Sequence, residues 1–361
     1  MGCLGENQMK LMAVNESILG LKAARNIYSA DGTLLIAAGL EIKEAYLNRL
    51  KELGVYSVYI DDGVREVEVE DVVSERTRVE ALKLTRNAMT RIGAGARMAI
   101  DEISRVMDDM MDELMANPKL MLNLVDIRAM NDYTFGHCVG VTVLSLMTAI
   151  TMGYNQFDLK KLGLGALFHD LGKIRIPESI LYKPGPLSPI EWEEMKRHAA
   201  IGFELLRERG DFNIVSAHVA FQHHEKFDGT GYPRGIRGRE IHEYARVVAL
   251  ADVYDALTTD RPYRPRKLPH QAILIIRDGI RTHFDPDIIP AFIANIAIYP
   301  VGTTLVLSTG EKARVIETTR RHPAAPVVRV VAAPDGRSVD GGRTIDLAKS
   351  HDVRIVAVDG Q

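Results

Sequence analysis

The stretch that decides the fold is HHEKFDGTGYP, residues 223–233. Two adjacent histidines and a carboxylate make poor core material, because each buried imidazole needs a hydrogen-bond partner. Gly229 and Gly231 follow them, and glycine loses more backbone entropy on folding than any other residue. The stretch therefore predicts ligands at the end of a helix, with a loop that folds back beside them.

The composition predicts a globular protein with more than one domain. The chain has 361 residues, of which 46% are hydrophobic and 26% charged, and its net charge of −3 gives no overall attraction to nucleic acid or acidic lipid. Cys3 and Cys138 lie far apart without metal-binding spacing, which excludes a disulfide framework and suits a reducing cytoplasm. The first ten residues lack the apolar core of a signal peptide, and the apolar run from Val139 is too short to span a membrane.

The chain divides into four predicted parts. Residues 1–70 mix short apolar runs with glycine turns and predict a small α+β accessory or regulatory module. Residues 71–117 predict one long linking helix that opens with a capping box of Thr77 and Glu80. Residues 118–295 predict a helical catalytic domain, and residues 296–361 predict a small β domain of short alternating runs. The fold class is therefore mainly α, a helical bundle with these two small flanking modules.

Methionines recur at helical spacing in the linking helix, among them Met107, Met110, Met111 and Met115. This pattern favours adaptable packing over a cofactor site, because the methionine side chain is flexible and fills irregular gaps. Such a helix would also allow two copies of the chain to pair as a homodimer.

Two histidines extend the apolar stripes of predicted helices. The stripe of the first helix is spaced by three, four and three residues: Leu159, Leu162, Ala166 and His169. The second helix starts at Ser188, whose capping box is completed by Glu191, and it turns His198 inward. A single inward histidine is most simply a core residue bonded to a backbone carbonyl, so neither residue alone predicts a site.

Several such residues together favour a metal centre. Asp252 lies among apolar residues, where an isolated carboxylate is costly unless a cation is near. Asp255, one turn later, would support a ligand or cap a neighbouring element. The full set has five histidines and two aspartates, enough for two divalent ions of iron, manganese or zinc, with Asp170 as the natural bridging carboxylate: His137, His169, Asp170, His198, His223, His224 and Asp252.

The ordered motifs resemble a known family. They are NDYTFGH, HDLGKIRIP, EEMKRHAAIG, HHEKFDGTGYP, ADVYDALTTDRPYR and HFDP, over roughly residues 128–290. This set is similar to the HD-GYP branch of the HD-domain metal-dependent phosphohydrolases. The resemblance implies a helical, cytoplasmic bacterial enzyme that hydrolyses the second messenger cyclic di-GMP to linear pGpG and, in some members, to GMP.

The resemblance also assigns roles by position. It implies that the seven residues above are the metal ligands, that Asp170 and Lys173 are catalytic, and that Lys173, Arg261 and Arg264 hold the substrate phosphates. The signature turn is Gly231, Tyr232 and Pro233, whose implied role is shaping and partner contact.

Two positions depart from the family pattern. Some members bind a third metal through a glutamate where this chain has Tyr133, so two metals are expected here, iron or manganese first, with zinc, magnesium or nickel also compatible. Cys138 stands where members often carry serine, and it is expected to be a small buried residue.

Three alternatives stay open at this stage. The stretch RPYRPRK from Arg261 could contact a nucleic-acid polymer, but it is short, and Pro262, Pro265 and the nearby Pro269 favour one compact anionic ligand. The substrate could be another nucleotide, such as 3′,3′-cyclic GMP-AMP or a nucleoside phosphate. The domain could also be a non-catalytic receptor for cyclic di-GMP, or dock on a diguanylate cyclase (GGDEF) domain through the GYP turn. The intact ligand positions favour the enzyme.

Overall fold

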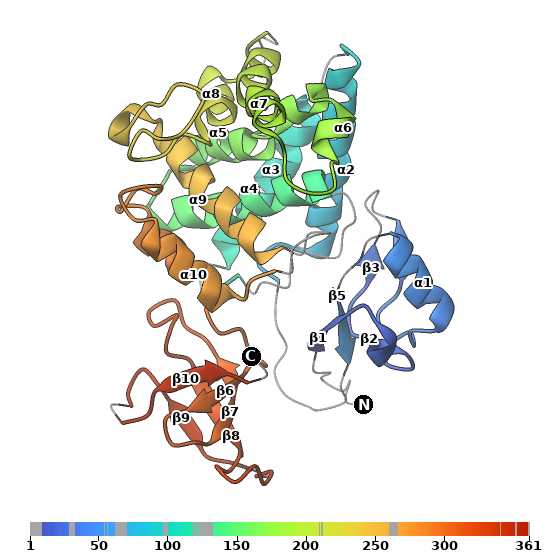
Figure 1. The fold of residues 1–361 in the computed structure, drawn as a ribbon, viewed down its shortest axis with the longest axis vertical. Helices are drawn as coiled ribbons and strands as arrows, with labels where there is room; N and C mark the ends of the chain where they lie inside the picture. Colours follow the sequence, from blue (N-terminus) through green and yellow to red (C-terminus); the bar gives the residue numbers. More distant parts are fainter. Residues whose placement is uncertain are drawn as a thin grey trace.

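The structure is a computed structural model, and it describes residues 9–28, 33–53, 55, 57–61, 71–96, 100–117, 121–122, 133–208, 210, 212–259, 266–339, 341–350 and 352–359. Figure 1 shows a helical body with a small α+β module on one side and a β domain beyond α10. Each of these three parts has its own cluster of buried apolar side chains. The predicted fold class is therefore confirmed.

The N-terminal module is built on a three-stranded antiparallel sheet in the order β1-β5-β2. Its strands and helices are β1 (Met9–Ala13), η1 (Glu16–Ile18), β2 (Lys22–Ala23), β3 (Ile27–Tyr28), β4 (Leu34–Ile36), α1 (Glu44–Glu52) and β5 (Ser57–Asp61). The side chains of Ile18, Ile42 and Ile60 are completely buried between sheet and helix. The short apolar runs of the sequence thus form a core of their own.

Residues 71–117 differ from the single helix expected. They form two helices, α2 (Glu75–Gly93) and α3 (Ile100–Ala116), and Gly95 adopts a left-handed φ of +75° after the first. The N-cap of α2 is Ser74, whose hydroxyl accepts a hydrogen bond from the Thr77 amide, so the helix starts before the predicted capping box. Local propensity favoured a continuous helix, but the left-handed glycine turn allows the chain to fold back.

The apolar faces of α2 and α3 belong to the main core. Met107, Met110 and Met111 are buried there, against the helices that carry the candidate site. The methionines are therefore packing residues, as expected. Their burial within one chain also means that this face is not open for pairing with a second copy.

The helical body continues from α4 to α11 and contributes most of the core. Its elements are α4 (Tyr133–Thr151), α5 (Gln156–Leu167), η2 (Leu171–Arg175), α6 (Glu178–Leu181), α7 (Pro189–Arg207), α8 (Ile214–Gln222), η3 (Gly238–Glu240), α9 (Glu243–Thr258), α10 (Pro269–Asp278) and α11 (Ile289–Ile293). The apolar run from Val139 lies in α4, which packs against α5 and α9. The capping box of Ser188 and Glu191 at the start of α7 is present as predicted. Among the described helices, none combines the length and apolar character that crossing a bilayer requires.

Two glycines let the η2 backbone lie directly on α7. A Cβ atom on Gly172 would come within 1.9 Å of the His198 carbonyl oxygen, and one on Gly202 would lie 3.1 Å from the Gly172 amide nitrogen. Any larger residue at Gly172 would hold the two backbones apart. This contact places Asp170, which immediately precedes η2, beside His198 on α7.

The C-terminal domain is a five-stranded antiparallel sheet in the order β10-β6-β7-β8-β9. Its strands are β6 (Thr304–Leu307), β7 (Lys312–Glu317), β8 (Val327–Ala332), β9 (Thr344–Asp346) and β10 (Ile355–Val358). The loop between β7 and β8 reaches the helical body, where Arg320 donates hydrogen bonds to Thr151 Oγ1 at 2.5 Å and to Asn295 Oδ1. Asn295 in turn donates to the Met147 carbonyl of α4 at 3.2 Å, which ties the β domain to that helix.

Candidate metal centre

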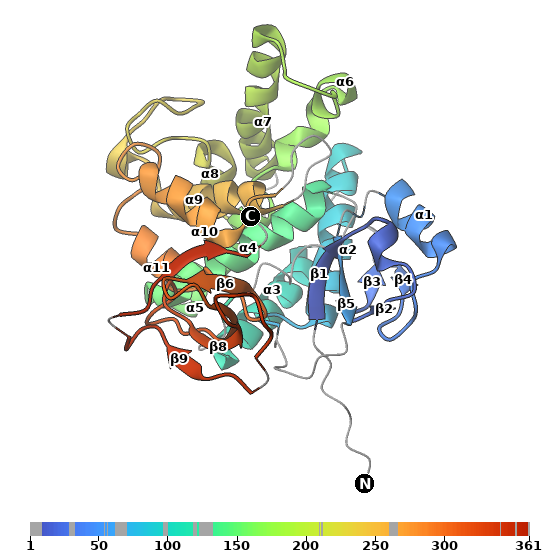
Figure 2. The same ribbon diagram turned by 60° about the horizontal axis from the view of Figure 1, so that its bottom comes forward.

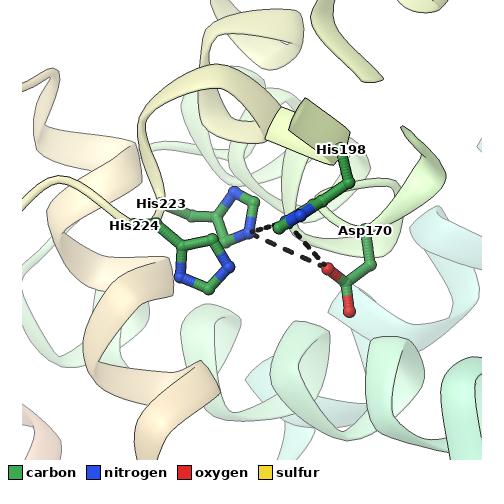
Figure 3. A group of neighbouring side chains, drawn as sticks. All are labelled: Asp170, His198, His223 and His224. Carbon is green, nitrogen blue, oxygen red and sulfur yellow. Dashed lines mark hydrogen bonds and ion pairs between the residues drawn. The ribbon is translucent and has the colours of Figure 1, made fainter. Parts of the chain in front are cut away.

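All seven residues predicted to bind metal converge in the helical body. They form three overlapping groups whose donor atoms lie within 4.8 Å of one another: Asp170, His198, His223 and His224; His137, His169 and Asp170; and His169, His223 and Asp252. Figure 3 shows the first group, in which His198 and His223 point toward the Asp170 carboxylate. These residues come from α4, α7, α9, the turn after α5 and the end of α8, so the site depends on the tertiary fold.

His169 reaches the cluster differently from the prediction. Helix α5 ends at Leu167 with Phe168 as its C-cap, so His169 lies in the turn after the helix and does not extend its stripe. The residue is nevertheless completely buried. Its Nδ1–H donates a hydrogen bond to the Ala166 carbonyl oxygen at 2.7 Å, and this bond sets the direction of the ring.

The same backbone contact orients two more imidazoles. His198 Nδ1–H donates to the Met195 carbonyl at 2.7 Å, and His223 Nδ1–H donates to the Ala220 carbonyl at 2.9 Å. Because Nδ1 carries the proton in each ring, the Nε2 atom keeps its lone pair and faces the cluster. Metal-binding histidines commonly use this arrangement, in which one ring nitrogen is held by a carbonyl and the other coordinates.

Two buried polar atoms in the cluster have no hydrogen-bond partner among the described residues. They are His169 Nε2 and Asp170 Oδ1. Asp170 Oδ1 lies 3.6 Å from His198 Nε2 and 3.8 Å from His223 Nε2, too far for hydrogen bonds. Buried polar atoms are almost always satisfied, so donors held at this spacing fit cations shared between them. The residues present thus suit divalent metal ions.

His137 is held by two carboxylates. Its Nε2 lies 3.0 Å from Asp252 Oδ1, and its Nδ1 lies 2.7 Å from Asp255 Oδ2. Burial opposes the charged form of the ring, but the hydrogen bonds to Asp252 and Asp255 outweigh it and raise the pKa of His137 to about 10. Asp255 therefore supports a candidate ligand, which is one of the two roles expected for it.

The three histidines of the first group are kept neutral. Burial lowers the pKa of His198, takes that of His223 well below its usual range, and lowers the pKa of His224 to about 3. Neutral imidazole is the form that coordinates metals. The electrostatics of the buried site therefore favour the ligand state of these side chains at neutral pH.

Lys173 lies beside the predicted bridging carboxylate. Its Nζ atom is 2.5 Å from Asp170 Oδ2. Burial disfavours the charged amine, yet the Asp170 carboxylate raises the pKa of Lys173 above its ordinary value. A fixed positive charge therefore stands next to the cluster.

The cluster opens to solvent on one side. The side chains of His224, Lys173 and Asp252 are 27%, 23% and 14% exposed, whereas that of Asp170 is only 2% exposed. An anionic ligand would therefore approach past His224, Lys173 and Asp252.

The signature turn packs beside this opening. The Tyr232 ring lies 4.7 Å from the His224 ring, measured between centroids. A Cβ atom on Gly231 would lie 2.3 Å from the Lys226 amide nitrogen and 2.5 Å from the His224 carbonyl oxygen, so only glycine allows the loop to fold back this closely. The loop therefore lies where the HHEKFDGTGYP sequence predicted it.

Glu225 has a role that the sequence reasoning missed. It is buried, and its carboxylate accepts a hydrogen bond from the Arg234 amide at 2.8 Å. It is absent from the groups of candidate ligands. Glu225 thus holds the loop that contains the GYP turn. Its position in the sequence, directly between two candidate ligands and a glycine loop, is the feature that could have predicted this role.

Four further positions from the sequence analysis lie outside the groups of candidate ligands, and the structure describes only one of their side chains. Arg261 and Arg264 lie within residues 260–265, outside the described residues, and the side chain of Tyr133 at the start of α4 is likewise not described. Cys138 is completely buried, as expected of a small packing residue.

Comparison with known proteins identifies the family. A family profile described as HD domain matches residues 110–288, and one described as KOW domain associated with HD domain matches residues 304–361. A cyclic di-GMP phosphodiesterase of Pseudomonas aeruginosa is 30% identical over 95% of this chain and 88% of its own. The chain belongs to the HD-GYP family. Its GYP turn and seven convergent candidate ligands agree with that membership.

Two further relatives each match about half of this HD-GYP protein. A 3′3′-cGAMP-specific phosphodiesterase of Vibrio cholerae is 35% identical over 52% of this chain and 40% of its own. A cyclic di-GMP phosphodiesterase of Thermotoga maritima is 39% identical over 44% of each chain.

Proposed function

We propose that this HD-GYP protein is a metal-dependent phosphodiesterase that hydrolyses cyclic di-GMP to linear pGpG, with GMP as a further product. The observation that carries the proposal is the buried cluster of seven ligand-type residues beside Lys173. The names of the Pseudomonas aeruginosa and Thermotoga maritima relatives support the choice of substrate.

The centre would hold two divalent ions, with iron or manganese as the first candidates because imidazole and carboxylate ligands suit them. Asp170 belongs to two of the three groups of candidate ligands and would contribute to both ions. Bound divalent ions supply Lewis-acid stabilisation of phosphoryl oxygens and a source of nucleophile from water at neutral pH.

The chain's own residues would bind and orient the substrate. Lys173 carries its positive charge at the open side and would hold a non-bridging phosphate oxygen, assisted by Arg261 and Arg264. Water attacks phosphorus and the P–O3′ bond breaks, so the ribose 3′ oxygen leaves and takes up a proton. The product keeps its phosphate on the 5′ oxygen. The negative charge that develops on the phosphoryl group is the charge that Lys173 would stabilise.

The test is hydrolysis of cyclic di-GMP by the full-length protein, purified anaerobically and loaded with iron or manganese. We expect His169→Ala with Asp170→Ala to lose both bound metal and turnover, and Lys173→Ala to keep its metal and to show lower turnover. A double variant that retains a full complement of metal would contradict the ligand assignment. Absence of any product from the loaded wild-type protein would contradict the enzymatic function.

The name of one relative supports a second candidate substrate. The Vibrio cholerae protein that is 35% identical over 52% of this chain is named for 3′3′-cGAMP. Incubation with each cyclic dinucleotide, followed by chromatography of the products, distinguishes the two activities. Tight binding of cyclic di-GMP without product would instead favour a receptor, and the GYP turn would then be the surface to test against diguanylate cyclase (GGDEF) domains.

The flanking parts would serve as separate domains. We propose that residues 1–70 form a separate accessory or regulatory module and residues 296–361 a separate small β domain, because each has its own buried core. Residues 71–117 would belong with the catalytic body, since their apolar faces contribute to its core. Removal of residues 1–70 should leave turnover intact and change its regulation, and failure of that protein to fold would argue against the boundary.

A further inference from the structure

An exposed aromatic side chain stands next to the open side of the metal centre. Trp192, in the first turns of α7, is 47% exposed, and it is the only tryptophan of the chain. Figure 2 shows α6 and α7 projecting from the helical body. A ligand that covered this ring would remove apolar surface from water, which favours binding.

A continuous row of rings leads from the metal centre to this side chain. Tyr232 lies 4.7 Å from the candidate ligand His224, and Trp192 lies 6.2 Å from Tyr232, each distance measured between ring centroids. Trp192 and Tyr232 meet edge to face, at an interplanar angle of 80°. This geometry fixes Trp192 against Tyr232 while leaving half of the tryptophan surface in solvent.

A lysine amine also lies beside the row. Lys196, one turn after Trp192 on α7, places its Nζ atom 5.8 Å from the centre of the Tyr232 ring. Its partner is the Glu193 carboxylate at 2.6 Å, on the same helix. Lys173 is a second cation at the opening. Aromatic surface together with nearby cations is the combination that binds single-stranded nucleotides, where bases stack on rings and phosphates meet basic groups.

We propose that Trp192 is the platform on which one purine base of the cyclic dinucleotide stacks, with Tyr232 holding the tryptophan at the required orientation. The inference rests on the proposed function and adds a base-binding position to it. In this assignment one phosphate of the cyclic dinucleotide would lie at the metal centre, and one base would reach past His224 to Tyr232 and Trp192. Trp192 contributes binding and takes no part in the bond cleavage.

The proposal predicts that loss of the Trp192 ring changes KM but not kcat. Loss of base–aromatic stacking weakens nucleotide binding by about tenfold or more. Trp192→Ala should therefore raise KM for cyclic di-GMP by that factor and leave kcat unchanged, because stacking is the same in the ground state and the transition state. Trp192→Phe should restore most of the affinity, since it keeps an aromatic face.

A matched control is Phe157→Ala. Phe157 is also an exposed aromatic residue, 69% exposed at the start of α5, and it contacts the Lys161 amine rather than the candidate site. Its loss should change neither KM nor kcat. Unfolding temperatures equal to that of the wild-type protein in both alanine variants would show that neither substitution disturbs the fold.

Fluorescence gives a second readout that does not depend on turnover. Because Trp192 is the only tryptophan, its emission reports on its own environment alone. Rapid mixing of the manganese-loaded wild-type protein with cyclic di-GMP should quench the emission before product forms, with N-acetyltryptophanamide as the control for light absorption by the nucleotide.

The outcomes separate this inference from the proposed function. Normal hydrolysis by the wild-type protein, with no change in emission and an unaltered KM in Trp192→Ala, would overturn the platform and leave the function intact. Quenching without hydrolysis would support the platform in a receptor and overturn the enzymatic function. Neither quenching nor hydrolysis would overturn both.

Discussion

Replacement of Gly172 by alanine tests how the candidate centre is assembled. The added Cβ would lie 1.9 Å from the His198 carbonyl oxygen and 2.6 Å from the Gly202 amide nitrogen. Both atoms belong to the backbone of α7, so no side chain can rotate away. Ordinary contact begins at 3.4 Å, and η2 and α7 must therefore separate by about 1.5 Å, the difference between 3.4 Å and 1.9 Å.

This separation should affect both stability and metal binding. Overpacking of a close contact costs about 1–3 kcal/mol, which lowers the unfolding temperature of a domain of this size by about 2–12 °C. The shift also moves Asp170 away from His198. In the wild-type protein Asp170 Oδ1 and His198 Nε2 lie 3.6 Å apart, and a larger separation should lower the metal content. Thermal unfolding of the full chain and elemental analysis after purification measure the two effects.

Two other glycines provide a graded series. A Cβ on Gly93 would meet only the Ile174 Cδ1 atom at 3.6 Å, so Gly93→Ala should be tolerated. Gly202→Ala should be intermediate, because its Cβ would lie 3.1 Å from the Gly172 amide nitrogen. If Gly172→Ala matched Gly93→Ala in both unfolding temperature and metal content, the argument that this contact builds the site would be refuted.

Three further predictions concern groups around the helical body. Asp255→Asn should weaken metal binding by about 10- to 100-fold, as measured by chelator competition, because the carboxylate orients His137 from behind; an unchanged affinity would remove Asp255 from that role. Burial lowers the pKa of His218, so the folded protein binds this proton less readily than the unfolded chain, whose pKa is near 6.5. Stability should therefore fall as pH drops below that value, and the fall should be shallower in His218→Gln when urea unfolding is compared at pH 5 and pH 8; identical pH dependence would count against the shift. Arg320→Ala should speed proteolytic cleavage between the helical body and the β domain, because its hydrogen bonds cross between them, whereas Arg321→Ala, with an exposed side chain, should cleave like the wild type; equal rates for all three proteins would exclude this link.

Local patterns predicted most of the elements. The Ser188 capping box marked the start of α7, and the alternating runs marked four of the five C-terminal strands, because caps and side-chain periodicity depend only on residues near in sequence. The short strand β9 was missed, since three residues carry too little periodicity. The long helix was predicted across residues 71–117, where Gly95 instead adopts a left-handed conformation that composition does not reveal.

For the site, the chain alone determined which side chains could act as ligands, because imidazoles and carboxylates at apolar positions need partners wherever they are buried. Only the tertiary structure decided how they meet. The bare backbone of Gly172 sets the distance between Asp170 and His198, and Asp255 reaches His137 from another helix. Distances between elements follow from packing, which no local pattern encodes. The contact of Asp255 with His137 and the hydrogen bond of Glu225 to the loop could therefore be identified only from the packed helices.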